Sequence, residues 1–141
     1  MSTLKVTNVA HETSTLNTLV FDNGGGSGNG RVTTKGTIGE ITAISYASTI
    51  TLDFRTGNNF STTLTGNTTF ANPSNISAGQ SGVLFITQDG TGRRTAAFGS
   101  YWDFSDGTAP TLSTGANQVD VIAWIARTNT NIAAQFIGNF S

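Results

Sequence analysis

The sequence predicts an all-β protein, an antiparallel β-sandwich or jelly roll preceded by an extended N-terminal arm. Three observations support this fold class. Short apolar segments recur at a spacing of about ten residues, as in sandwiches and jelly rolls. These segments are rich in β-branched and aromatic residues, which favour strands. Gly, Asn, Asp or Pro separates one segment from the next, which is typical of turns, and no segment requires a helix.

The strongest strand signal lies in residues 82–98, which read GVLFITQDGTGRRTAAF. The apolar run at 83–86 is typical of a strand that is covered on both faces. Asp89 and Gly90 follow it, with Gly92 two residues further on, and residues 95–98 supply a second apolar segment. This pattern predicts a β-hairpin with a Gly-containing loop, around which the rest of the body is built.

The segment before this body is predicted to be an extended arm. Residues 4–9 alternate in a short strand pattern, residues 18–21 form another, and the Gly-rich run NGGGSGNG occupies residues 23–30. Such a run forms a flexible linker or a wide turn. It lacks the GK[ST] ending of a phosphate-binding loop. Since few large apolar residues occur before Ile44, we assign residues 1–45 to the arm and residues 46–141 to the sandwich body.

The remaining strands of the body follow from alternation and turn signals. Pro110 marks a loop or an edge position. Helical spacing can also be drawn through residues 119–127, VDVIAWIAR, but their β-branched content favours a strand. Residues 128–131 are the predicted turn into the closing strand. The expected strands outside the central hairpin are 48–54, 60–64, 68–71, 101–104, 119–127 and 132–140.

Composition excludes several classes of function. Charged residues make up 11% of the 141 residues, about half the usual share, and the net charge is −1. The seven basic residues are scattered, so nucleic-acid binding is not expected. No apolar run approaches bilayer length, and no basic segment followed by an apolar one resembles a secretory signal. A surface with so little charge favours association with other chains.

Residues with catalytic potential are few, and we expect no enzyme activity, no metal ion and no cofactor. The only histidine, His11, lies in the predicted arm, away from any rigid pocket. Asp103 and Asp106 share one loop region, and Asp89 and Asp120 lie elsewhere, so a glycosidase pair or a Ca²⁺ site stays open as an alternative. Turn chemistry already explains the two Asp-Gly pairs.

Aromatic residues are the better candidates for recognition. Tyr101 and Trp102 are adjacent, so on a strand they point to opposite faces, and Trp124 lies in the strand at 119–127. An exposed ring among them could stack on a sugar. We favour a place in the core or in a subunit interface for all three.

Residues 63–141 resemble a module at the C-terminal end of tailed-phage virion proteins, particularly those of cyanophages, which are often described as tail-fibre or virion structural proteins. The strings that carry the resemblance are TLTGNTTFANPSN at 63–75, GQSGVLFITQDGTGRRTAAFGSYWDF at 79–104 and PTLSTGANQVDVIAW at 110–124. The resemblance implies a non-enzymatic, homotrimeric component of the virion surface, assembled in the host cytoplasm. It transfers no catalytic residue.

The position in the particle has two interpretations. Longer fibre proteins carry a shaft, which lets them project from the particle, and no shaft is seen between this arm and the module. Our first interpretation is therefore a head-decoration (cement) protein. The arm would then add strands to the major capsid protein or other virion proteins. The alternative is a tail-fibre or tail-tip subunit, with a carbohydrate as a possible ligand. The arm residues expected to anchor the chain are Leu4, Val6, Val9, Val20 and Phe21.

Overall fold

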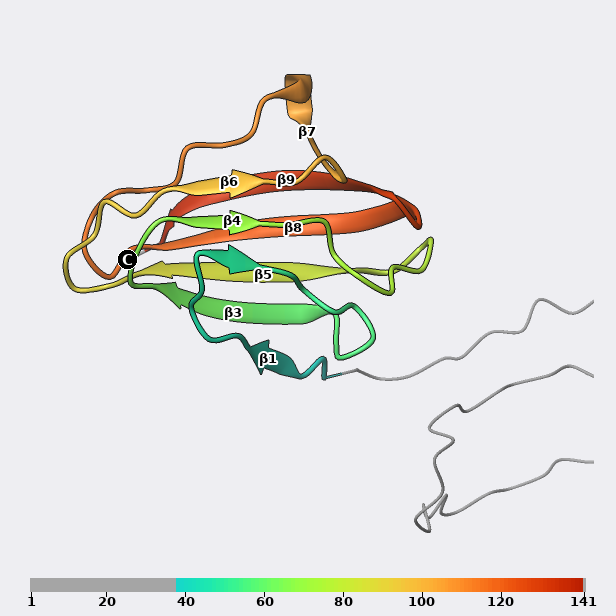
Figure 1. Ribbon diagram of the computed structural model, residues 1–141, viewed down its shortest axis with the longest axis horizontal. Coiled ribbons are helices and arrows are strands. Elements are labelled where there is room, and N and C mark those ends of the chain that lie inside the picture. Colours follow the sequence, from blue (N-terminus) through green and yellow to red (C-terminus); the bar gives the residue numbers. More distant parts are fainter. Residues whose placement is uncertain (1–37, 141) are drawn as a thin grey trace, which may run out of the picture. The chain divides into compact units, whose positions relative to one another are not determined.

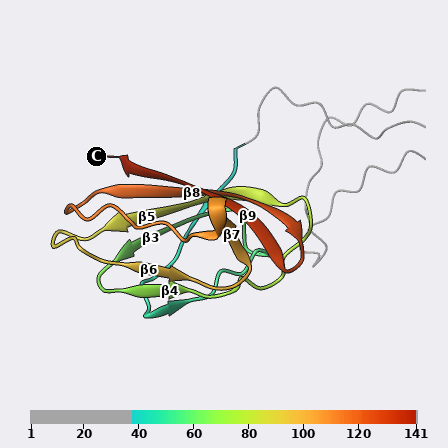
Figure 2. The same cartoon turned by 90° about the horizontal axis from the view of Figure 1, so that it is seen from above.

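The computed structural model describes residues 38–140, which form two stacked β-sheets (Figures 1 and 2). Sheet A has six strands in the order β1-β3-β5-β8-β9-β7, and sheet B has three in the order β2-β4-β6. A single turn of 3₁₀ helix, η1, follows β7. The elements are β1 (Ile41–Ala43), β2 (Thr49–Ile50), β3 (Asn59–Leu64), β4 (Thr68–Phe70), β5 (Ser81–Gln88), β6 (Ala96–Phe98), β7 (Trp102–Phe104), η1 (Ser105–Gly107), β8 (Val119–Thr128) and β9 (Asn131–Phe140).

The first six strands alternate between the sheets, so the chain forms a short coil. β1, β3 and β5 pair in parallel in sheet A, and β2, β4 and β6 pair in parallel in sheet B. Each connection leads to the opposite sheet instead of turning back, and each strand therefore lies beside the strand two positions earlier. This is the arrangement of a β-solenoid, in which successive turns stack on one another.

The last three strands complete sheet A. β8 and β9 form a long antiparallel hairpin, which is the strand, turn and strand predicted for residues 119–140. β8 also pairs antiparallel with β5, and β7 lies parallel to β9 at the sheet edge. Among residues 38–140, no helix is long and apolar enough to cross a membrane.

The all-β fold class is confirmed, but the predicted pairing is only partly correct. Antiparallel pairing is limited to β5–β8 and β8–β9, and the other pairs in both sheets are parallel. The predicted hairpin at 82–98 is wrong, because β5 belongs to sheet A and β6 to sheet B. Alternation of side chains reports which residues face the core, but it is the same for parallel and antiparallel strands.

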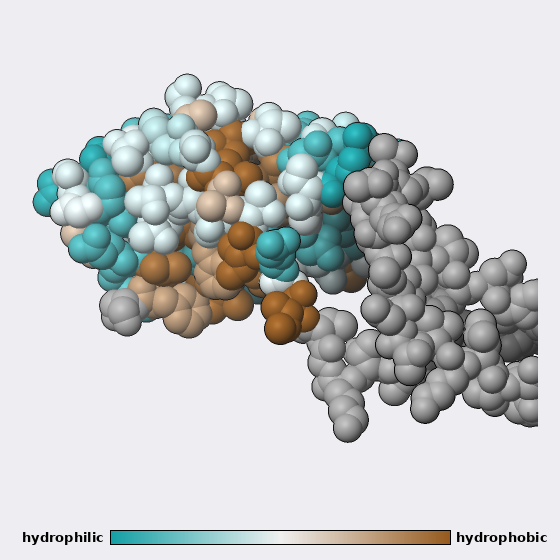
Figure 3. Space-filling model, turned by 90° about the horizontal axis from the view of Figure 1, so that it is seen from below, coloured by the Kyte–Doolittle hydropathy of each residue, from teal (hydrophilic) through white to brown (hydrophobic). Residues whose placement is uncertain are grey.

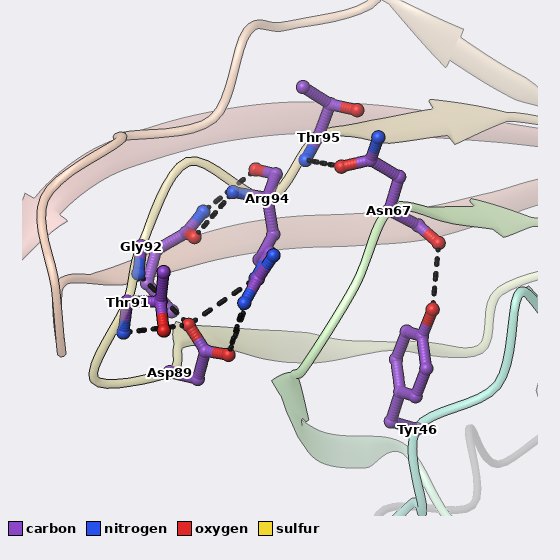
Figure 4. Close-up of polar contacts among 8 residues, drawn as sticks. Tyr46, Asn67, Asp89, Thr91, Gly92, Arg94 and Thr95 are labelled. Carbon is purple, nitrogen blue, oxygen red and sulfur yellow. Dashed lines mark hydrogen bonds and ion pairs between the residues drawn. The ribbon is translucent and has the colours of Figure 1, made fainter.

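Contacts at the end of β5 and in the loop between β5 and β6 explain why these two strands do not form a hairpin (Figure 4). Gln88 is buried, and its amide accepts the N–H of Arg94 and donates to the C=O of Arg94, both at 2.9 Å. A side chain thus satisfies backbone groups that a hairpin would pair with β5. Gly92 and Arg93 both have positive φ, which redirects the chain toward sheet B.

Aromatic side chains fill the space between the sheets. Phe54 stacks on Trp124 with ring centroids 4.1 Å apart, and Phe70 stacks on Phe98 at 5.4 Å. Aliphatic side chains of β5, β8 and β9 complete the same cluster. Phe54 lies outside any strand, since only Thr49–Ile50 of the strand expected at 48–54 forms one.

β1 lies within residues 1–45, which were assigned to the arm, and it pairs with β3. The predicted arm anchors Leu4, Val6, Val9, Val20 and Phe21, together with His11 and the Gly-rich run, lie outside the described residues.

Candidate interaction face

The outer side of β5, β8 and β9 in sheet A is largely apolar, and it is the main candidate for a functional surface. In β5, Leu84 and Ile86 point into the core, and the residues that alternate with them point outward. Register aligns Phe85 with Val121, and Val121 with Ile137, so outward side chains form rows across three strands. We define the apolar face by its residues, which are Val83, Phe85, Val119, Val121, Ala123, Ile125, Ala133, Ile137 and Phe140.

Several large side chains of the apolar face are open to solvent. Ile125, Ile137 and Phe140 are 49%, 46% and 49% exposed, and nothing within residues 38–140 covers them. Figure 3 views the domain from the side of β1, and hydrophobic residues gather along the lower margin of this view. Single exposed apolar residues are ordinary, but a contiguous group of them marks an interaction surface.

The strand sequences explain why this face is apolar. Residues 83–86 and 121–126 are continuous apolar runs, without the polar-outside alternation of a sheet that faces water. Such runs are typical of strands covered on both faces. Residues 38–140 supply the inner cover only.

A hollow of about 570 Å³ lies in the outer side of sheet A, at the end of the apolar face next to β7. Ala123 and Ala133 leave the space open because their side chains are small, and Ile125 forms one wall. Asp103, at the edge, makes an ion pair with Arg127 at 3.2 Å. Both side chains of this pair are well exposed, so it adds little to stability. The other lining residues include Phe104, Ser105 and Gln135.

The outer side of sheet B has a different composition. Register places Thr49 next to Thr69 in β2 and β4, and Thr69 next to Ala97 in β6. All three residues are exposed, and each is polar or small. This side needs no cover from another chain.

The structure places the predicted aromatic candidates mainly inside the domain. Trp102 and Trp124 are 6% and 4% exposed and belong to the core cluster. The indole N–H of Trp102 donates to the C=O of Ala71 at 3.2 Å. Tyr101 packs against the core from a half-buried position. Neither indole ring is therefore accessible as a platform for a sugar.

Asp89 organises the loop between β5 and β6 (Figure 4). Its carboxylate accepts the N–H groups of Thr91 and Gly92 at 3.0 and 2.9 Å and makes an ion pair with Arg94 at 2.8 Å. The hydrogen bond from Arg94 is the main reason why the pKa of Asp89 lies below its usual value, and the two backbone N–H groups lower it further. The carboxylate is thus fully engaged in holding the loop.

The other aspartates also have local structural roles. Asp120 is buried and accepts the backbone N–H groups of Ser113 and Asn139 at 2.8 and 3.0 Å. Asp106 has a φ of 59° within η1. No group of three or more His, Cys, Asp or Glu side chains that could hold a metal ion occurs among residues 38–140. Sequence reasoning singled out these carboxylates. It also predicted that the strand at 83–86 is covered on both faces, but it did not identify the residues of the apolar face as a candidate site.

A small all-β domain with an uncovered apolar face is typical of a module that assembles with other chains. A family model described as "Putative phage tail fibre C-terminal domain" matches residues 7–130, and the chain belongs to this family. It is therefore a structural protein of a phage and a component of the virion. The comparison with curated proteins found no match, and neither did the comparison with solved structures.

The family confirms the resemblance drawn from residues 63–141, and its match begins much nearer the N-terminus. It favours the tail-fibre alternative over head decoration, which was our first interpretation from the sequence. The preference for a head position relied on the lack of a shaft and on an anchoring arm, whose residues lie outside the described part of the chain.

Proposed function

We propose that the chain is the C-terminal domain of a phage tail fibre or tail tip and that it acts without enzyme activity. The observation that carries this proposal is the match of the tail-fibre family model to residues 7–130. The match spans most of the chain, including nearly all of the described domain.

The roles of the polar residues support a non-enzymatic function. Asp89 and Asp120 are engaged by backbone N–H groups, and Asp89 also by Arg94. Asp103 pairs with Arg127 at the border of the hollow. Carboxylates held in this way serve loops and edges, whereas a glycosidase needs two of them facing each other across a cleft.

The fibre is proposed to contain three copies of the chain. An uncovered apolar face on a domain of low charge supports self-association, and rings of identical subunits are a common solution. No other virion protein is needed to cover the face. Contacts with the major capsid protein, which the head interpretation required, are not part of this proposal.

Immunogold electron microscopy of the phage tests the proposed location. Antibodies raised against purified residues 38–141 should label the tail fibres or the tail tip and leave the head shell unlabelled. Antibodies against the major capsid protein serve as the control, since they should label only the head. Uniform labelling of the head by the first antibody would overturn the proposal and revive the decoration interpretation.

A further inference from the structure

We propose that copies of this chain bind one another through the apolar face of sheet A, with the Ile137–Phe140 end of one copy packed in the hollow of the next. The inference rests on the proposed function only for the number of copies, which is three. The surface itself follows from the size, charge and shape of the apolar face.

The apolar face extends over three long neighbouring strands. It covers β5, β8 and β9, which have 8, 10 and 10 residues. With a rise of about 3.3 Å per residue and a strand spacing of about 4.8 Å, these strands span roughly 450 Å² of flat area. Side chains that project from the sheet, and the walls of the adjoining hollow, add accessible surface to this flat area. The flat area alone is a little over half of the value of about 800 Å² per partner that is usual for specific interfaces.

Charge selects a second copy as the partner. The outward positions within the apolar face, including Gln135 between Ala133 and Ile137, carry no Asp, Glu, Lys or Arg. The pair Asp103–Arg127 lies at the border of the face. An anionic membrane surface would require clustered cations on this face, and a glycan would require directed polar groups. A neutral, apolar face is complementary to another neutral, apolar face, which each copy of the chain carries.

The shape of the face supplies complementary parts at its two ends. Ile137 and Phe140 lie at one end of β9 and are half exposed, whereas Ala133, at the other end, opens into the hollow. Phe140 lies seven positions after Ala133, which is about 23 Å along a strand. One copy cannot bring these two ends together, so the exposed apolar side chains at one end can meet the hollow only between copies.

A charge placed on the apolar face should separate the subunits. We expect Ile137→Asp to raise the dissociation constant of the assembly more than about tenfold, because the carboxylate would be buried without a partner. Thr69→Asp, an exposed strand position on sheet B, is the matched control and should leave the assembly intact. Sedimentation velocity of the full chain over a concentration series measures both. Equal assembly of the two variants would overturn the proposed surface.

Disulfide trapping tests the pairing of the two ends and does not depend on the folding of a charged variant. The chain has no cysteine, so introduced thiols have no competitors. Under mild oxidation, the double variant Ala133→Cys/Phe140→Cys should give covalent trimers on a non-reducing gel. Each single variant should stay monomeric. An intrachain bond is excluded, because the two Cα atoms are far more than about 7 Å apart.

The outcomes separate this inference from the proposed function. Covalent dimers without trimers would keep the apolar face as the contact and remove the trimer from the proposed function. Trimers that form in solution without any crosslink would keep the trimer and overturn the proposed pairing of the two ends. Neither result changes what immunogold labelling says about the tail.

Discussion

The outer sides of the two sheets differ although their inner sides are alike. Both sheets direct aromatic and aliphatic side chains into one core, where Trp124 of sheet A and Phe70 of sheet B are each buried. Outward, sheet B presents Thr49, Thr69 and Ala97, and sheet A presents the apolar face. The difference between the two sides lies in their outward residues and not in the core, and an uncovered apolar side is the basis of the proposed contact between copies.

Strand length separates the sheets as well. The central strands of sheet A have 8 to 10 residues, whereas those of sheet B have two or three. Contacts from sheet A hold sheet B in place. One of them is made by Gln88, the last residue of β5, whose side-chain amide bonds to the backbone of Arg94 in the loop before β6. We therefore expect sheet A to determine the stability of the domain, and we expect the short strands of sheet B to stay ordered only through their contacts with sheet A. The following variants test this comparison, from the largest expected effect to the smallest.

Gly82→Ala should have the largest effect, because it disrupts the centre of sheet A. A Cβ at Gly82 of β5 would overlap the carbonyl group of Asn58 and approach the Trp124 ring at 3.0 Å. We expect the free energy of unfolding to fall by more than about 3 kcal/mol, as for other backbone clashes in a core. Urea denaturation followed by tryptophan fluorescence measures the change. Gly90→Ala is the control, since a Cβ there would meet no atom within 4 Å.

Truncation of Phe70 and of Phe85 should separate folding from assembly. Phe70 of sheet B is fully buried, so Phe70→Ala should cost about 3 to 5 kcal/mol at every protein concentration. Phe85 belongs to the apolar face, so Phe85→Ala should lower the melting temperature of the assembly in a concentration-dependent way. Calorimetry over a hundredfold range of concentration distinguishes the two. A concentration-independent loss for Phe85→Ala would mean that the face is not an interface.

Gln88→Leu should weaken the link between the sheets. The substitution leaves the N–H and C=O of Arg94 without their side-chain partner, which costs about 1 to 3 kcal/mol for buried groups. Hydrogen exchange should then accelerate in β6 more than in β8. Equal protection in both strands would contradict the dependence of sheet B on this contact.

Asp89→Asn should have the smallest effect and a characteristic dependence on pH. The pKa of Asp89 is lowered in the folded chain, mainly by Arg94, so its stabilising effect is present above the pKa of the unfolded state. This effect is lost as the pH falls through the lowered value. The melting temperature of Asp89→Asn should therefore lie slightly below that of the wild type at neutral pH, and the difference should vanish in acid.

Asp106→Asn is the matched control for the pH experiment. Asp106 has a positive φ of 59°, a conformation that Asn also tolerates. The melting temperature of Asp106→Asn should follow that of the wild type across the same pH range. A pH-independent difference for Asp89→Asn would mean that the carboxylate charge does not stabilise the loop.

Local sequence patterns determined much of this fold. Alternation and β-branched content identified β3, β4, β5, β7 and the β8–β9 hairpin, and the strings at 63–124 carried the resemblance that the family match confirms. The strand expected at 48–54 was shorter, because Leu52 and Phe54 are buried without continuous pairing. An apolar side chain can be buried from a loop as well as from a strand, so an apolar alternation does not by itself establish a strand.

The sequence by itself determined the all-β class, the positions of most strands and the membership in a tail-fibre family. Tertiary structure decided which strands pair, that β5 and β6 belong to different sheets, and that nothing among residues 38–140 covers the outer side of β8 and β9. The physical reason is that side-chain periodicity is local, whereas strand pairing and the cover of a face depend on contacts between residues far apart in the chain.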